Sequence, residues 1–94
     1  MNPADRLTAL RAVVLDGPGV TDRDLRTAAA SGTAPGAWTG YVKSVRDTSY
    51  RVSEEDITAL KAAGFGEEEI FEVTVAAAVG AAFDLFQTGL RALP

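Results

Sequence analysis

The side chains that most often carry out chemistry are sparse in this chain. Its 94 residues include no cysteine and no histidine. That excludes thiolate and imidazole nucleophiles and bases, and also metal sites built on cysteine or histidine. Among the carboxylates that remain, Glu72 is the one candidate for catalysis, because Phe71 and Val73 flank it with apolar surface. A half-buried carboxylate of this kind can serve as a general acid or base.

A structural role for Glu72 is nevertheless favoured over a catalytic one. Partly buried glutamates usually form ion pairs, and the candidate partners are Lys43, Arg46 and Arg51. No metal site is expected, because dimetal carboxylate sites in helical bundles also use histidine. The glutamates at 67–69 are expected to be solvated residues at the start of a helix, where the helix dipole favours negative charge.

Four residues could line a small-molecule pocket: Trp38, Tyr41, Tyr50 and Arg51. The simpler expectation is that these aromatic residues belong to a core or an interface. The glycine clusters at 16–19 and 64–66 match neither a phosphate-binding loop nor a dinucleotide fingerprint. We therefore expect no cofactor.

The elements that must position these residues are helices. Caps, prolines and glycines predict an all-α bundle of about five helices with no convincing strand. The first predicted helix has Asn2 as its N-cap and ends at residues 16–19. The second begins at residues 21–24, which have the spacing of a capping box, and ends near Gly32. The third begins at Pro35. Residues 50–52 are predicted to be an extended link. A fourth helix begins after Ser53 and ends at a Gly64–Phe65 stop, where Phe65 folds back on Leu60.

The last predicted helix runs from Glu67 to at least Leu90, and its middle, residues 75–83, has no polar side. A helix that is apolar all round must be covered on every side. Small residues spaced four apart would let another helix backbone approach closely, so part of this helix is predicted to be a seam between subunits. The candidate interface residues are Val73, Ala76, Ala77, Gly80, Ala81, Phe83, Asp84, Gln87 and Arg91. Reciprocal Asp84–Arg91 pairs could set the register there. The alternative is one central helix inside a monomeric bundle.

Composition limits the partners and the location. The chain length corresponds to one domain, residues 1–94, and the net charge is −4. Scattered cations and an acidic balance argue against nucleic-acid binding, and the longest apolar run is too short for a bilayer, so no membrane association is expected. The first residues do not look like a signal peptide, which predicts a cytoplasmic protein. Arginine outnumbers lysine and alanine is abundant, which suggests a bacterial source.

One stretch resembles a known family. Residues Tyr50-Arg51-Val52-Ser53-Glu54-Glu55-Asp56-Ile57, then Leu60-Lys61-Ala62-Ala63-Gly64-Phe65-Gly66 and the helix that follows resemble the alkylhydroperoxidase D-like and carboxymuconolactone decarboxylase superfamily. The resemblance implies an all-α, oligomeric fold with a core over residues 35–92 and variable helices over 3–32. The family's peroxidase chemistry uses a Cys-x-x-Cys pair and a histidine, neither of which this chain has.

The expected function is therefore that of a non-catalytic structural or regulatory subunit. It would form a homo-oligomer and could also pair with a cysteine-containing homologous subunit. Two alternatives remain open. One is a small-molecule-binding enzyme of decarboxylase or isomerase type that uses Glu72 as its acid or base. The other is a monomeric helical module that binds a peptide.

Overall fold

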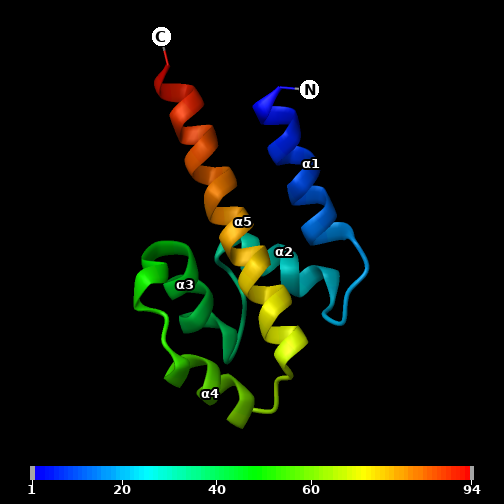
Figure 1. Cartoon of the computed structure of the whole chain (residues 1–94), viewed down its shortest axis with the longest axis vertical. Coiled ribbons are helices and arrows are strands. Elements are labelled where there is room, and N and C mark those ends of the chain that lie inside the picture. Colours follow the sequence, from blue (N-terminus) through cyan, green and yellow to red (C-terminus); the bar gives the residue numbers. More distant parts are fainter. Residues whose placement is uncertain (1, 94) are drawn as a thin grey trace.

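The computed structural model describes residues 2–93 and contains helices only within that range. The five α-helices are α1 (Pro3–Asp16), α2 (Arg23–Ser31), α3 (Trp38–Thr48), α4 (Glu54–Ala62) and α5 (Glu67–Ala92), and a short 3₁₀ helix, η1 (Ser49–Arg51), follows α3. The all-α prediction is thus confirmed. Figure 1 shows α5 as the longest element, with α2 behind it, α3 and α4 at its N-terminal half, and α1 beside its C-terminal half.

Most helix ends follow from local chemistry. The Asn2 side chain accepts a hydrogen bond from the backbone nitrogen of Asp5 at 2.9 Å, which caps α1 as predicted. Gly32, with φ of 77°, ends α2 in the left-handed conformation that favours glycine. The Ser53 backbone nitrogen donates to the Asp56 carboxylate at 2.9 Å, closing the capping box that begins α4.

The turn between α4 and α5 is a Schellman motif. Phe65 N donates to Leu60 O at 3.2 Å and Gly64 N donates to Lys61 O at 3.0 Å, while Gly64 has φ of 102°. The Phe65 side chain packs against the core cluster and lies over Trp38, with the ring centroids 4.4 Å apart. This confirms the predicted stop and directs the chain back along the bundle into α5.

Three local predictions differ from the structure. Residues 49–51 form η1 instead of an extended link, and α3 begins at Trp38, after a turn in which Trp38 N donates to Pro35 O at 3.2 Å. The N-cap of α2 is Asp22 and not Thr21. The Thr21 hydroxyl is unavailable as a cap because it binds a carboxylate of α5, a contact between residues 51 positions apart in the chain.

The core is built largely from alanine and valine. Val42 of α3 and Val73 of α5 are completely buried, as are Ala29, Ala76 and Ala77. Small side chains allow helix axes to approach closely, and α2 packs directly against α5. The segment 3–32 therefore covers α5 and is part of the same hydrophobic core, to which Leu15, Ala29 and Ala30 belong.

Candidate interaction surface

Glu72 lies on α5 beside the loop that joins α1 to α2. Its carboxylate accepts hydrogen bonds from Val20 N at 2.8 Å, from Thr21 N at 3.0 Å and from the Thr21 hydroxyl at 2.6 Å. These bonds, the Thr21 hydroxyl and Val20 amide above all, lower the pKa of Glu72, and the nearby guanidinium of Arg26 acts in the same direction. The expected partners Lys43, Arg46 and Arg51 are replaced here by the donors of one loop.

Glu72 is therefore a structural anchor in this geometry. A general base that works near neutral pH needs a pKa that is raised, and the hydrogen bonds to Glu72 act in the opposite direction. In the described part of the chain, no three histidine, cysteine, aspartate or glutamate side chains lie close enough together to hold a metal ion.

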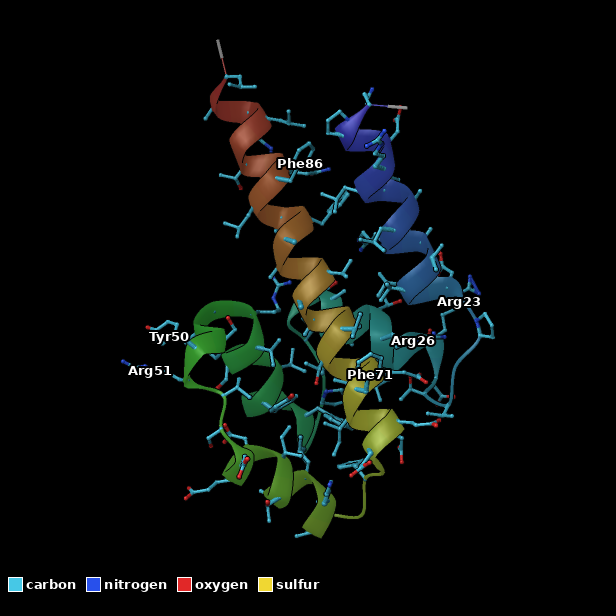
Figure 2. All side chains as sticks on the ribbon, in the orientation of Figure 1. Arg23, Arg26, Tyr50, Arg51, Phe71 and Phe86 are labelled. Carbon is cyan, nitrogen blue, oxygen red and sulfur yellow. The ribbon has the colours of Figure 1, made fainter. Side chains whose placement is uncertain are left out.

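The four candidate pocket residues do not come together. Trp38 and Tyr41 are core residues, 4% and 8% exposed. The Tyr41 hydroxyl is 2.6 Å from the Thr74 hydroxyl, a contact that joins α3 to α5. Tyr50 is 79% exposed on η1 and has the Arg51 guanidinium over its ring, 5.8 Å from the centroid. Figure 2 shows Tyr50 and Arg51 pointing away from the body of the molecule.

Four of the nine candidate interface residues are buried within the single chain: Val73, Ala76, Ala77 and Gly80. A Cβ atom added at Gly80 would overlap the Ala30 carbonyl oxygen and the Ala30 Cα. The close helix approach that the small residues of α5 were expected to permit is thus made by α2 of the same chain. The inner face of α5 is thus used in folding at these four positions.

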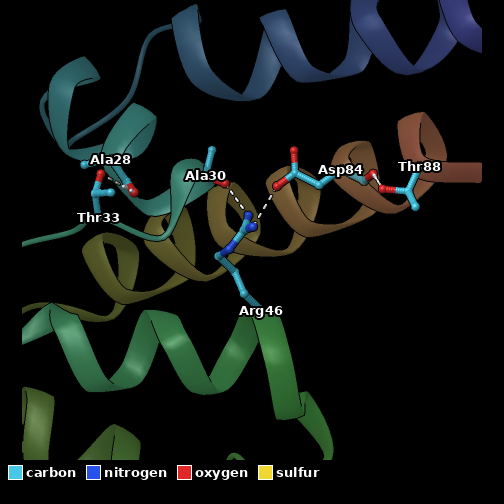
Figure 3. Close-up of polar contacts among 6 residues, drawn as sticks. All are labelled: Ala28, Ala30, Thr33, Arg46, Asp84 and Thr88. Atoms are coloured by element: carbon cyan, nitrogen blue, oxygen red, sulfur yellow. Dashed lines mark hydrogen bonds and ion pairs between the residues drawn. The ribbon is translucent and has the colours of Figure 1, made fainter. Parts of the chain in front are cut away.

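Asp84, one of the polar candidates on α5, also binds within the chain. Asp84 pairs with Arg46 of α3, with 2.7 Å between Oδ2 and Nη2, where a reciprocal pair with Arg91 was expected. Figure 3 shows Arg46 reaching both Asp84 and the backbone carbonyl of Ala30 on α2. Phe83 is half-buried and has the Arg11 guanidinium 5.1 Å from its ring centroid, which links α5 to α1. Ala81 is half-buried, while Gln87 and Arg91 are exposed.

Sequence reasoning missed the outer face of α5. Its members are spaced alternately four and three residues apart and all are apolar: Phe71, Val75, Ala78, Ala82, Leu85, Gly89 and Ala92. We call these seven residues the outer seam. Val75 is half-buried and the other six are exposed, with Phe71 at 69% and Leu85 at 74%. The alternation was visible in the sequence, but only the position of α2 shows which of the apolar faces of α5 stays open.

Hollows border the outer seam on both sides. The larger, about 460 Å³, lies between α5 and the α3–η1 segment and includes Val45, Val52, Ala81 and Leu85 in its wall. A smaller one, about 180 Å³, separates α1 from the other end of the seam and is lined in part by Val13, Phe71 and Val75. The seam is thus a ridge with a mainly apolar hollow on either side, a shape suited to a helical partner.

No protein-family model, curated protein sequence or solved structure matches this chain. No helix within residues 2–93 has the length and the apolar character needed to cross a lipid bilayer.

Proposed function

We propose that this chain is a non-catalytic, self-associating helical subunit with a structural or regulatory role. The observation that carries the proposal is the amount of surface the single chain leaves uncovered. Its accessible area is 6101 Å², whereas a compact monomer of the same mass exposes about 5,200 Å². The difference, about 900 Å², is close to the ~800 Å² that each partner contributes to a standard protein interface.

The uncovered surface includes large apolar side chains that gather on two helices. Six are about half exposed or more on α1, α5 and the residue that ends α5: Leu10, Val13, Phe71, Leu85, Leu90 and Leu93. Isolated exposed hydrophobics are ordinary, but several of them on two neighbouring helices of a small protein are typical of an interaction site. Burying this surface would supply the driving force for association.

The chemistry of Glu72 supports the same proposal over the enzyme alternative. Its carboxylate is occupied by three hydrogen bonds from one loop, and its pKa is lowered. Both features suit a residue that joins α5 to the α1–α2 loop.

We also propose that the chain is a short, cytoplasmic bacterial member of the alkylhydroperoxidase D-like and carboxymuconolactone decarboxylase superfamily. The proposal rests on the residue spacing over 50–78 and on the α4–turn–α5 arrangement in which those residues lie. In such a protein a cysteine-containing homologue is a natural second partner. Co-purification from the native source, followed by mass spectrometry, tests for it.

Light scattering after size-exclusion chromatography tests self-association directly. We expect a mass of at least twice the 9.8 kDa of the chain at micromolar concentration. A homogeneous species of 9.8 kDa up to millimolar concentration would contradict the proposed function.

A further inference from the structure

The outer seam of α5 has the spacing of a coiled-coil contact. Residues that alternate at four and three positions stay on one face of a helix, and a helix with such a face packs against another with side chains interdigitated. The seam extends over seven positions, from Phe71 to Ala92, and the position that would continue it toward the N-terminus is Glu68. All six charged residues of α5 lie off the seam: Glu67, Glu68, Glu69, Glu72, Asp84 and Arg91.

We propose that the outer seam pairs with the same seam of a second copy in an antiparallel, two-fold arrangement. This inference rests on the proposed self-association and specifies its surface and direction. The occupant is a second copy because the seam is complementary to itself. If the two-fold axis passes the level of Gly80, Phe71 faces Gly89 of the other copy, Val75 faces Leu85, and Ala78 faces Ala82. Phe71, the largest side chain of the seam, thus faces Gly89, which has no side chain.

The available space agrees with this pairing. Gly89 is exposed, and a Cβ atom added there would have nothing within 4 Å, so the partner's Phe71 can occupy that position. The two alanines at the centre allow the helix backbones to approach closely. Gly80, which lies against the backbone of α2, is on the other side of α5 from the seam, so pairing requires no rearrangement of the bundle.

Charge selects the antiparallel direction. A parallel pair would bring the acidic first turns of two helices together, with Glu67, Glu68 and Glu69 from each copy at one end. Like charges at that distance repel, and parallel helix dipoles add to the repulsion. In the antiparallel pair each acidic turn lies near the end of the partner helix that carries Arg91, and the dipoles oppose one another.

A charge placed on the seam tests the surface. In Leu85→Glu the new carboxylate would be buried opposite Val75 of the other copy, so we expect the mass measured by light scattering to fall twofold. Leu85 is 74% exposed in the single chain, so the helical circular dichroism should be unchanged. Gln87→Glu adds the same charge to an exposed residue of α5 outside the seam and should leave the mass unchanged. If the Leu85→Glu protein is still an oligomer, the outer seam is not the contact surface, although the proposed self-association still holds. If the native chain is a monomer, both the seam and the self-association are wrong.

Disulfide formation tests the direction. The chain has no cysteine, so a single introduced one reports on a single contact. Val75→Cys and Leu85→Cys proteins, one of them labelled with ¹⁵N, are mixed and oxidised, and mass spectrometry separates mixed from like disulfides. In the antiparallel pair positions 75 and 85 face each other, whereas like positions are about 15 Å apart along the axis, beyond the reach of a disulfide. We expect mixed disulfides. Disulfides between like positions would show a parallel pair. If neither Val75→Cys nor Leu85→Cys forms a disulfide and Gln87→Cys does, the dimer uses a different surface.

Discussion

Glu72 on α5 binds the loop between α1 and α2, which lies about 50 residues away in the sequence. Its carboxylate accepts hydrogen bonds from the backbone amides of Val20 and Thr21 and from the hydroxyl of Thr21, a residue that is only 7% exposed. Hydrogen bonds to a charged acceptor are stronger than those between neutral groups. This carboxylate therefore holds the α1–α2 connection against α5 and fixes where α2 begins.

Replacing Glu72 by glutamine should destabilise the fold. We expect Glu72→Gln to lower the free energy of unfolding at pH 7 by about 1–2 kcal/mol, because a neutral amide accepts these bonds less strongly and its NH₂ group faces donors. Urea denaturation measures the loss. Glu68→Gln removes the same charge from an exposed residue of the same helix and should change the stability by less than about 0.5 kcal/mol. Equal effects of the two changes would show that Glu72 does not anchor the loop.

The Glu72 contribution should also depend on pH. Its pKa is lowered in the folded state, so the folded protein binds this proton less readily than the unfolded chain. The stabilisation is complete above the ordinary titration range of a glutamate and is lost as the pH falls through the lowered pKa. We expect the difference in stability between the native protein and Glu72→Gln to shrink below about pH 4. A difference that grows on acidification would contradict this sign.

Gly80 is the other residue whose neighbours decide its role. The backbone of Ala30 on α2 occupies the space where a side chain at position 80 would lie. Gly80→Ala should therefore separate α2 from α5 and cost about 2 kcal/mol or more, or prevent folding. Gly40→Ala on α3 is the matched control, because a Cβ atom there meets nothing within 4 Å, and it should stabilise by about 0.5–1 kcal/mol. Thermal unfolding separates the two, and a neutral Gly80→Ala would show that α2 does not lie this close.

At the scale of elements, Arg46 joins three helices. It extends from α3, donates to the Ala30 carbonyl on α2 and pairs with Asp84 on α5 at 2.7 Å (Figure 3). The Arg46 side chain is 16% exposed and that of Asp84 is 61% exposed. The buried half of this arrangement, the bond to the carbonyl, is therefore expected to contribute more than the exposed ion pair.

Substitutions on α3 and α5 test this ranking. We expect Arg46→Met to lower the free energy of unfolding by about 1–3 kcal/mol, because the Ala30 carbonyl loses its donor. Asp84→Asn should cost less than about 1 kcal/mol, as exposed ion pairs do. Lys43→Met, an exposed cation one turn earlier on α3, is the control and should be nearly neutral. Urea denaturation of the three variants gives the order, and a larger cost for Asp84→Asn would reverse it.

At the scale of the whole molecule, the helices form an elongated body. The principal extents are 48 × 28 × 19 Å, because α1 and the C-terminal half of α5 extend together beyond the α2–α4 region (Figure 1). Such a shape has a high surface for its mass, and a second copy along α5 would restore a more usual ratio of surface to volume.

Self-association should make the thermal stability depend on protein concentration. A partner that binds only the folded chain stabilises it by mass action. Raising the concentration a hundredfold should raise the Tm by about 5 °C. Scanning calorimetry or circular dichroism measures this shift. The Leu85→Glu variant should show no such dependence, and a native protein whose Tm is equally independent of concentration would be folding as a monomer.

The sequence by itself determined the helices and most of their ends. Asn2, Gly32, Ser53 and Gly64 act on backbone groups only a few residues away, so their effects can be derived from spacing and side-chain type alone. The all-α class and the start of the last helix at Glu67 follow from the same local chemistry.

The tertiary structure alone decided which residues meet across the bundle. Thr21 was locally suited to cap α2, but a carboxylate 51 residues away binds it more strongly. The middle of α5 is apolar on every side, so periodicity could not tell which face α2 would cover. In the tertiary structure Gly80 packs against Ala30, while Phe71 and Leu85 stay exposed. The sequence could not show this, because the hydrophobic effect favours burial of apolar area without specifying which residues bury it.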